Sequence, residues 1–365
     1  MKALPAVLTD PVYHKPATYS WLDTQLLKVC QDERDLPFAR LLVNISLTLI
    51  PLALLLYVPG LPGWLWWSAA VLFHFLNNIR FKGPFGLMLH CVCHRPLFKK
   101  EHDWLNMGIP WVIGPLFGQT PETYYTHHMG MHHAENNMPE DTSSTMRYQR
   151  DSLGSFLQYL GDFIAVGIFR LLSYFKRKKK QKFLFKSIRG EAAFFALCVG
   201  LSFVNWPATF TVFILPFLIS RVIMMLGNWT QHAFVNPIDP ANAYHNSVTC
   251  LNTKYNHKCW NDGYHTSHHV RPALHWTEHP NHFLKTLPKY VQHEAIVFDG
   301  IHWLHLFAWL MTKRYDLMAR HFVNVGERYT SDEEVIELLK SRTRRFAETT
   351  PYAPVPSSRL VSHGV

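Results

Sequence analysis

The chain has 365 residues, of which 48% are hydrophobic and only 17% are charged. This length alone allows one large domain or two ordinary ones. The formal net charge of +10 does not indicate a nucleic-acid-binding protein, because such proteins interleave basic residues with exposed aromatic residues and have no membrane spans, whereas this chain has long apolar stretches.

The first 40 residues are polar and carry both signs of charge. They lack the short charged start and the apolar core of a secretory signal, and they are not rich in arginine and serine like a transit peptide. We therefore expect residues 1–40 to form a cytosolic N-terminal segment.

The first apolar stretch lies between Arg40 and Arg80, where no residue is charged. A membrane-spanning helix needs about 20 mostly apolar residues. The stretch therefore has room for two spans, at about 41–57 and 63–79, joined by a turn at 59–62. The alternative is a pair of buried helices in a large soluble protein, and the length of the uncharged stretch argues against it.

Two histidine motifs follow the first apolar stretch. The first reads HxxxH and comprises His90 and His94, and the second reads HxxxHH and comprises His128, His132 and His133. Residues three and four apart share one face of a helix, so each motif can direct two imidazoles at one place. A single HxxxH is more often a pair of partly buried, hydrogen-bonded residues, but ordered repeats of the motif favour metal ligands.

Residues 153–175 combine apolar side chains with Asp162 and Arg170. We expect this segment to form a helix that lies on the membrane surface, and a fifth span is the second interpretation. A basic run at 176–182 follows it. A basic run beside membrane spans marks the cytoplasmic side and the anionic lipid surface.

A second apolar stretch lies between Glu191 and Arg221. It holds two spans, at about 191–205 and 207–227, if Arg221 extends its charged end to the membrane surface. Two hairpins return the chain to one face of the membrane. The remaining residues then form one cap on that face: 1–40, 81–190 and 228–365. The positive-inside rule places this cap, and with it both termini, in the cytosol.

The third motif, HxxHH, comprises His265, His268 and His269. The three motifs contain eight imidazoles, which is too many for one metal ion and about right for two. We interpret the fold as all-α and multi-pass, with two transmembrane helical hairpins and a cytosolic helical cap that holds the metal site. Residues 286–342 form the helical C-terminal part of the cap, and residues 343–365 form a flexible tail.

The order of these motifs around a second membrane hairpin resembles the superfamily of membrane fatty acid desaturases and hydroxylases. The resemblance implies a di-iron centre, with O₂ as co-substrate, that is held almost wholly by histidine. It also implies one more ligand between the second hairpin and the third motif. His232 is the best match for this ligand, and His245 and His257 are its rivals. His127 replaces its neighbour His128 if the register of the second motif changes.

The resemblance covers residues 41–285, which we interpret as a fatty acid desaturase-like domain. The predicted metal ligands are His90, His94, His128, His132, His133, His232, His265, His268 and His269. Acidic residues near the motifs are candidates for orienting the imidazoles, and the alternative is that they are ordinary surface acids. These acids are Glu122, Glu135, Asp141 and Asp262. Three further histidines share a helical spacing that Pro280 interrupts, and we expect them around the ligands or at the surface: His275, His279 and His282.

The resemblance implies a lipid desaturase, which removes two hydrogens from a fatty acyl chain in the membrane. No side chain can break an unactivated C–H bond, whereas an oxygen-activating metal can. The spacing of the second motif also occurs in hydroxylases. A hydroxylase or ketolase that acts on acyl chains, alkanes or sterols is therefore the near alternative, and a non-enzymatic membrane metal-binding protein is the distant one.

The electron source is expected to be a separate protein. The first 40 residues are too few for a haem-binding domain, and the chain has no GxGxxG nucleotide-binding motif. The resemblance implies an external donor of the cytochrome b5 or ferredoxin type. The endoplasmic reticulum, a plastid and a bacterial inner membrane all fit such a protein.

Overall fold

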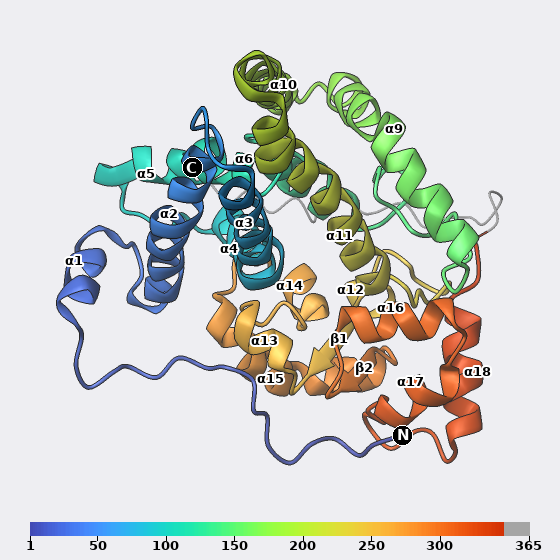
Figure 1. Cartoon of the computed structure of the whole chain (residues 1–365). Coiled ribbons are helices and arrows are strands. Elements are labelled where there is room, and N and C mark those ends of the chain that lie inside the picture. The colour runs from blue at the N-terminus through green and yellow to red at the C-terminus, as the bar shows by residue number, and fades with distance from the viewer. Residues whose placement is uncertain (347–365) are drawn as a thin grey trace.

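The computed structural model describes residues 1–346, and these residues are mostly helical (Figure 1). The first α-helices are α1 (Trp21–Val29), α2 (Leu36–Leu56), α3 (Gly63–His74), α4 (Lys82–His94), α5 (Asp103–Gly108), α6 (Gly114–Leu116), α7 (Thr123–His127), α8 (His133–Glu135) and α9 (Leu153–Arg177). They are followed by α10 (Gln181–Thr209), α11 (Leu215–Gln231), α12 (Ala243–Asn246), α13 (Lys254–Lys258), α14 (His265–Val270), α15 (His279–Gln292), α16 (Trp303–Met311), α17 (Tyr315–His321) and α18 (Asp332–Arg342).

Several helices meet through tighter or wider turns. Short 3₁₀ turns lie at Glu33–Asp35, Lys100–His102 and Trp276–Glu278. Segments of π-helix lie at Phe75–Phe81, Ile109–Ile113, His128–His132 and Phe210–Ile214. Because π-helical turns occur often at functional sites, the one that coincides with the second histidine motif is the most informative of the four.

Helices α2 and α3 lie side by side and are joined by a short turn. Gly60 in this turn has a φ of +71°, a backbone conformation that glycine adopts without steric cost. The indole nitrogen of Trp66 donates a hydrogen bond to the carbonyl oxygen of Leu56 at 3.0 Å and ties the two helices together. Helix α3 continues through π-helix into α4, so one unbroken helical rod carries the first histidine motif at its end.

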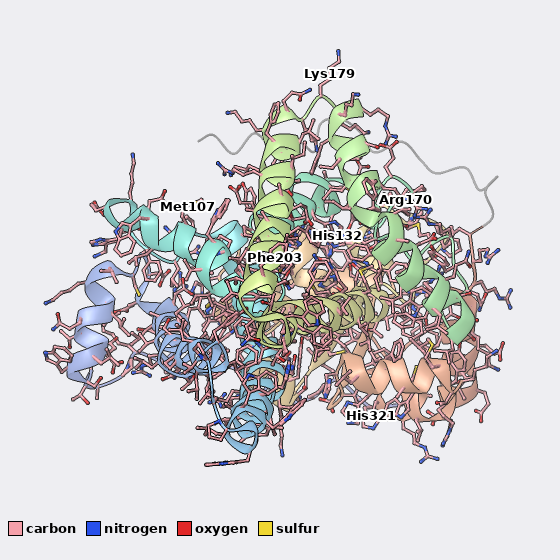
Figure 2. The ribbon with its side chains drawn as sticks, turned by 45° about the horizontal axis from the view of Figure 1, so that its top comes forward. Met107, His132, Arg170, Lys179, Phe203 and His321 are labelled. Carbon is pink, nitrogen blue, oxygen red and sulfur yellow. The ribbon has the colours of Figure 1, made fainter. Side chains whose placement is uncertain are left out.

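Helix α10 is bent at Asn205, whose φ of −158° and ψ of 97° are not helical. Pro207 follows, and proline cannot donate a backbone hydrogen bond inside a helix. The helix restarts there, with the side-chain oxygen of Asn205 accepting a hydrogen bond from the backbone nitrogen of Ala208 at 3.1 Å. Beyond the bend, which lies next to Phe203, α11 leaves the line of α10 and ends directly before His232 (Figure 2).

Three helical stretches of the described residues are long and apolar enough to cross a membrane. They are Glu33–Leu56, Leu153–Arg177 and Gln181–Gln231. Large apolar side chains such as Leu47 and Phe203 are exposed on them, as expected of surfaces that face lipid. The predicted span at 63–79 forms α3 and the following π-helix but is not among the three, because tryptophan, histidine and asparagine lower its hydropathy. Helix α9 is among them, which agrees with the second interpretation of residues 153–175 as a fifth membrane span.

Helix α9 is held near both ends by residues that lie close in sequence to predicted ligands. Near its start, Tyr159 packs against Trp229 at the end of α11, with ring centroids 5.0 Å apart. Near its end, Phe175 packs against Met131 in the second histidine motif. The start of α9 therefore lies near His232, and its end lies beside the second histidine motif.

Strands β1 (Val248–Leu251) and β2 (Ile296–Asp299) form a two-stranded parallel sheet in which Val248 pairs with Ile296. The interpretation of the fold as all-α did not include this sheet. Each strand is a short, nearly fully buried run, and periodicity alone cannot distinguish such a run from a buried helical segment. The sheet lies under α14 and supports the third histidine motif.

The end of the described chain is packed rather than loose. The backbone nitrogen of Arg150 donates to the carbonyl oxygen of Thr343, and that of Phe346 donates to the carbonyl oxygen of Met146. The first residues of the predicted flexible tail at 343–365 therefore make backbone hydrogen bonds with residues 146 and 150. The rest of that prediction, residues 347–365, lies outside the described residues.

Candidate metal centre

The structure brings all nine predicted ligands together in two neighbouring groups. The five-histidine group consists of His90, His94, His128, His133 and His268. The four-histidine group consists of His132, His232, His265 and His269. Within each group, the ligand nitrogen atoms all lie within 4.8 Å of one another. The sequence prediction of two metal positions therefore has a geometric counterpart.

The second motif divides its histidines between the groups in a way that the sequence pattern did not predict. We expected His128 and His132, four residues apart, to point at one place. The segment His128–His132 is instead π-helical, and its wider turn brings His128 beside His133, with their Nε2 atoms 3.0 Å apart. His132 then faces the other group. The prediction failed because it assumed an α-helical repeat.

The third motif also serves both groups. On α14, His265 and His269 are one helical turn apart, and their Nε2 atoms are 3.0 Å apart in the four-histidine group. His268 points to the other side, and its Nε2 atom lies 2.8 Å from that of His90. We expected the three side chains to meet at one place. Helix α14 in fact lies between the two groups and contributes to each.

The spacing of the nitrogen atoms suits metal coordination. In the five-histidine group, the Nε2 atoms of His94 and His128 are 2.9 Å apart. In the four-histidine group, those of His232 and His265 are 3.1 Å apart. Two nitrogen ligands at right angles on one ion, each about 2.1 Å from it, are about 3.0 Å apart. The donor set therefore fits two metal ions held by imidazole.

Burial keeps several of the grouped imidazoles neutral. It lowers the pKa of His128 and His268 well below the ordinary value, and neighbouring imidazoles lower it further. Burial also lowers the pKa of His94 to about 4. At neutral pH these rings carry no charge, and a neutral imidazole has the free lone pair that a metal needs.

Two ligands of the four-histidine group are oriented by hydrogen bonds from their far side. The Nδ1 atom of His132 lies 2.7 Å from a carboxylate oxygen of Asp141. The Nδ1 atom of His232 lies 2.8 Å from the carbonyl oxygen of Asn246. Both partners accept, so Nδ1 carries the hydrogen in each ring, and Nε2 presents its lone pair to the group.

Asp141 is held firmly in this role. It is fully buried and accepts hydrogen bonds from the backbone nitrogen and the hydroxyl group of Ser143, at 2.8 and 2.6 Å. The chain reaches it through Asn136 and Asn137, which have φ values of +48° and +63°. Asparagine tolerates this conformation better than most residues, so the Asn-Asn pair was a sequence signal of a turn that could have singled out Asp141.

Asp262 lies behind the five-histidine group. One of its carboxylate oxygens is 3.8 Å from Nδ1 of His90, and it accepts hydrogen bonds from Tyr255 and Trp303 at 2.9 and 2.8 Å. Burial raises the pKa of Asp262 to about 6, and the hydrogen bonds from Trp303, Tyr255 and Gln231 oppose this shift. Its carboxylate is thus fixed in place near the ligands without touching one directly.

The other two candidate acids serve packing instead. Glu122 is buried and pairs with Arg189, while Glu135 accepts a hydrogen bond from Tyr174 at 2.6 Å. Glu122 joins α7 to α10, and Glu135 joins α8 to α9. These contacts agree with the alternative given in the sequence analysis, in which such acids do not orient the imidazoles.

The rival histidines lie outside both groups. His245 lies 3.0 Å from the carbonyl oxygen of Asp239 through its Nδ1 atom and packs against His293. His257 is exposed on α13. His127 lies 3.4 Å from the hydroxyl group of Ser143. Of the candidates for the additional ligand, His232 is the one that the structure places in a group.

His275 belongs to a third cluster, with Asp32 and Asp35. Its Nε2 atom lies 3.0 Å from Asp35, but Asp32 already pairs with Arg34 and Arg95, at 2.7 and 2.9 Å. Two guanidinium groups balance this carboxylate, so the cluster resembles an ion-pair network more than a metal site. His279 and His282 both contact the hydroxyl group of Ser267, as outer supports of α14.

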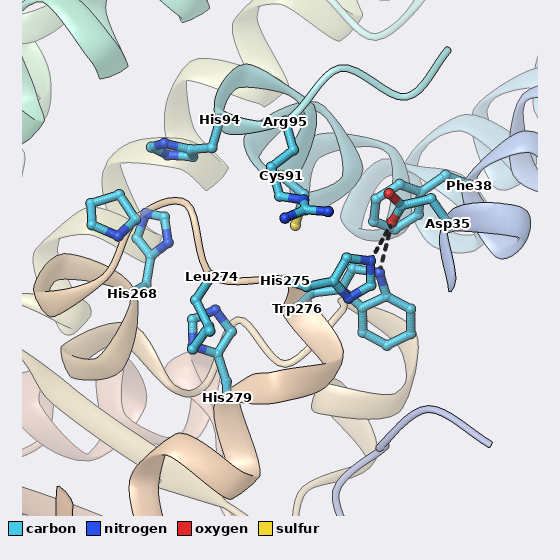
Figure 3. Close-up of a pocket in the computed structure, with 11 residues that line it drawn as sticks. Asp35, Phe38, Cys91, His94, Arg95, His268, Leu274, His275, Trp276 and His279 are labelled. Atoms are coloured by element: carbon cyan, nitrogen blue, oxygen red, sulfur yellow. Dashed lines mark hydrogen bonds and ion pairs between the residues drawn. The ribbon is translucent and has the colours of Figure 1, made fainter. Parts of the chain in front are cut away.

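A pocket connects this cluster to the five-histidine group (Figure 3). His94 and His268 line one end of it, and Asp35, His275 and Trp276 line the other. Figure 3 shows the ring of His275 and the indole of Trp276 turned toward the carboxylate of Asp35, so the polar groups at that end are occupied by one another.

The comparison with protein families gives one match. The family model described as "Fatty acid desaturase" matches residues 64–300, which is well over half of the chain and includes all nine grouped histidines. The comparison with curated proteins gives no match.

Proposed function

Because the chain belongs to the fatty acid desaturase family, we propose that it is an O₂-dependent oxidoreductase that desaturates a fatty acyl chain of a membrane lipid. We further propose that the nine grouped histidines hold two iron ions. One observation carries this proposal: two neighbouring groups of imidazole nitrogens, five in one and four in the other, with ligand distances in each group. Imidazole is a ligand that suits iron.

The chemistry of the proposal needs both the metals and the protein around them. Iron bound in the two groups would supply the oxygen activation that breaking an unactivated C–H bond requires. Burial lowers the pKa of ligands such as His128 and His268, and Asp141 and the carbonyl of Asn246 direct Nε2 of His132 and His232 inward. Neutral ligands leave a cationic site, and Asp141 and Asp262 offset part of that charge.

The membrane arrangement is the second part of the proposal. We propose a multi-pass protein in which α2 with α3, and α10 with α11, form two transmembrane hairpins, with both termini and the cap in the cytosol. The exposed apolar side chains of α2 and α10 support this arrangement. An acyl chain would then reach the cap from the lipid without crossing water.

The electron donor is the third part. We propose that an external donor of the cytochrome b5 or ferredoxin type docks on the basic loop at 176–182. Lys179 lies at its tip, and Lys176 and Lys182 are exposed beside it (Figure 2). Lys180 donates to the carbonyl oxygen of Gly130 at 2.7 Å, inside the second histidine motif. The loop is therefore both positively charged and in direct contact with a segment that carries ligands, which suits an acidic redox partner.

Expression in a host with a simple lipid profile tests the function. We expect a lipid product that has lost two hydrogens, formed only with O₂ and a reduced donor protein present, and about two iron ions per purified chain. His268→Ala should reduce both iron content and product. His321→Ala, a matched change on α17, should leave both unchanged.

The other outcomes distinguish the alternatives. A product that has gained one oxygen atom would make the protein a hydroxylase, an outcome that the spacing of the second motif makes the nearest rival. Full iron occupancy without turnover of any lipid would favour a non-enzymatic metal-binding protein. Zinc alone, or about one metal ion per chain, would contradict the di-iron assignment.

A further inference from the structure

The N-terminal segment crosses the surface of the cap as an extended strap of residues 1–11 (Figure 1). Two separate places fix this strap. At its start, the terminal amine of Met1 pairs with Asp332, and Lys2 pairs with Asp299 at 2.6 Å. At its end, Asp10 is 4% exposed and faces the loop at 252–264 that leads into the third histidine motif.

The carboxylate of Asp10 is the acceptor for four donors of that loop. The backbone nitrogens of Asn252 and Thr253 donate to it at 2.8 and 3.3 Å. The side-chain amide of Asn256 donates at 2.9 Å, and the hydroxyl group of Tyr264 donates at 2.6 Å. A single buried carboxylate from the far end of the sequence thus gathers both ends of the loop.

Other hydrogen bonds also hold the loop, such as that from the backbone nitrogen of Gly263 to the side-chain oxygen of Asn256 at 2.9 Å, but its backbone is strained in places. Asn252, Trp260 and Asn261 have positive φ values, which side-chain-bearing residues adopt at some cost in strain. Gly263 has no room for a side chain, because a Cβ atom there would overlap the side chain of Asn256 and the carbonyl oxygen of Cys250. A compact, strained loop of this kind depends on its hydrogen-bond acceptors.

Tyr264 transmits the position of the loop to the metal centre. It directly precedes His265, the first residue of α14, and its ring is fully buried. Two of the three motif histidines on α14 belong to the four-histidine group. A shift of the Tyr264 hydroxyl group would therefore move the start of α14 and with it the nitrogen atoms of His265 and His269.

We infer that Asp10 is a positioning residue of the metal centre, acting through Tyr264 on the histidines of α14. The inference rests on the proposed function, because it assumes that these histidines hold metal. The strap is then a component of the site, although it is remote in sequence from every ligand. A residue that only stabilised the fold would affect unfolding without altering one metal position more than the other.

The test uses the purified full chain in detergent, loaded with cobalt(II), whose absorption spectrum reports the coordination of each ion. We expect Tyr264→Phe and Asp10→Ala to accelerate cobalt release to a chelator by about tenfold or more for the four-histidine group, with a smaller effect on the other group. Asp10→Asn keeps one carbonyl oxygen as an acceptor and should give an intermediate rate. Asp316→Asn, an exposed aspartate paired with Arg314, is the control and should release cobalt like the wild type.

The possible results separate this inference from the proposed function. Wild-type release and spectra in folded Tyr264→Phe and Asp10→Asn chains would overturn the inference alone. Equal acceleration for both groups would also overturn it, since that would indicate general loosening. If Asp10→Ala does not fold, Tyr264→Phe decides, because it removes one hydroxyl group and keeps the buried ring. A wild-type chain that holds no metal would overturn the inference together with the proposed function.

Discussion

His132 donates its Nδ1 hydrogen to Asp141 across 2.7 Å, with both side chains buried. Its sequence neighbour His133 belongs to the other group of ligands. Two adjacent histidines therefore belong to different groups, and the carboxylate of Asp141 directly orients only His132. This asymmetry makes the two metal positions separable by experiment.

Removal of the Asp141 carboxylate charge should weaken metal binding by the four-histidine group. Loss of a partner that orients a metal-bound histidine typically costs about 10–100-fold in metal affinity, so Asp141→Asn should have an effect of that size on one of the two ions. Titration with iron or cobalt measures it. Glu140→Gln changes an exposed neighbouring acid and serves as the control, and equal affinities in the two variants would contradict the assigned role of Asp141.

Double substitutions should reveal which histidines share an ion. His132→Ala combined with His265→Ala should lose about one ion per chain, no more than either change alone, because both residues serve the four-histidine group. His133→Ala combined with His265→Ala should lose about two ions, because the residues serve different groups. Metal analysis of the purified variants decides, and the reverse pattern would show that the division between the groups is wrong.

Acid should destabilise the metal-free chain. Burial lowers the pKa of His94 to about 4 in the folded state, against about 6.5 in the unfolded chain. The unfolded state then binds more protons in this window, so the stabilising contribution is complete above about pH 6.5 and is lost as the pH falls toward 4. Thermal unfolding of metal-free protein between pH 8 and pH 4 measures this effect. If the unfolding temperature of His94→Asn falls less with pH than that of the wild type, His94 is the group responsible.

Charge reversal on the basic loop should impair reduction without impairing the site. Lys179→Glu combined with Lys182→Glu should raise the KM for an acidic donor protein several-fold at low salt, with little change at high salt, because salt screens exposed charges. Lys254→Glu, an exposed lysine on α13, is the control. Turnover driven by a small chemical reductant should be unchanged in all three proteins.

Accessibility to a membrane-impermeant thiol reagent should report the topology. Cysteines introduced at Lys182 and Asp316 should react from the cytosolic side, and one at Pro62, in the turn between α2 and α3, should react from the opposite side. Lys182 and Pro62 are exposed, and the side chain of Asp316 is 44% exposed. Reaction of positions 62 and 182 from one common side would refute the hairpin arrangement.

The sequence predicted the composition of the site better than its geometry. All eight histidines of the three motifs lie in one of the two groups, together with His232, the preferred candidate for the additional ligand, because ligand spacing on a helix is a local property of the chain. The division of His132 from His133 depends on a π-helical turn. A residue pattern that assumes an α-helical repeat cannot contain that information.

Contacts between distant segments were beyond the reach of the sequence for a different reason. The hydrogen bond from Tyr264 to Asp10 joins residues 254 positions apart, and neither residue lies in a motif. The pairing of β1 with β2 is equally non-local. Such contacts depend on how the whole chain packs, whereas the motifs and the apolar stretches depend on neighbours in sequence.

The parallel pairing of β1 with β2 also sets the order of events during folding. All nine grouped histidines precede residue 270, but β2, the partner strand of the β1 that packs against α14, ends at Asp299. Parallel strands require a long crossover, and contacts between distant segments form slowly. A nascent chain that has emerged only as far as α15 contains every ligand but lacks β2. The sheet against which α14, with three of the nine ligands, packs is then incomplete. Metal capture should therefore be a late event that follows synthesis of the C-terminal part, so premature chain termination after α15 would yield a protein with the complete motif set and a poorly held metal centre.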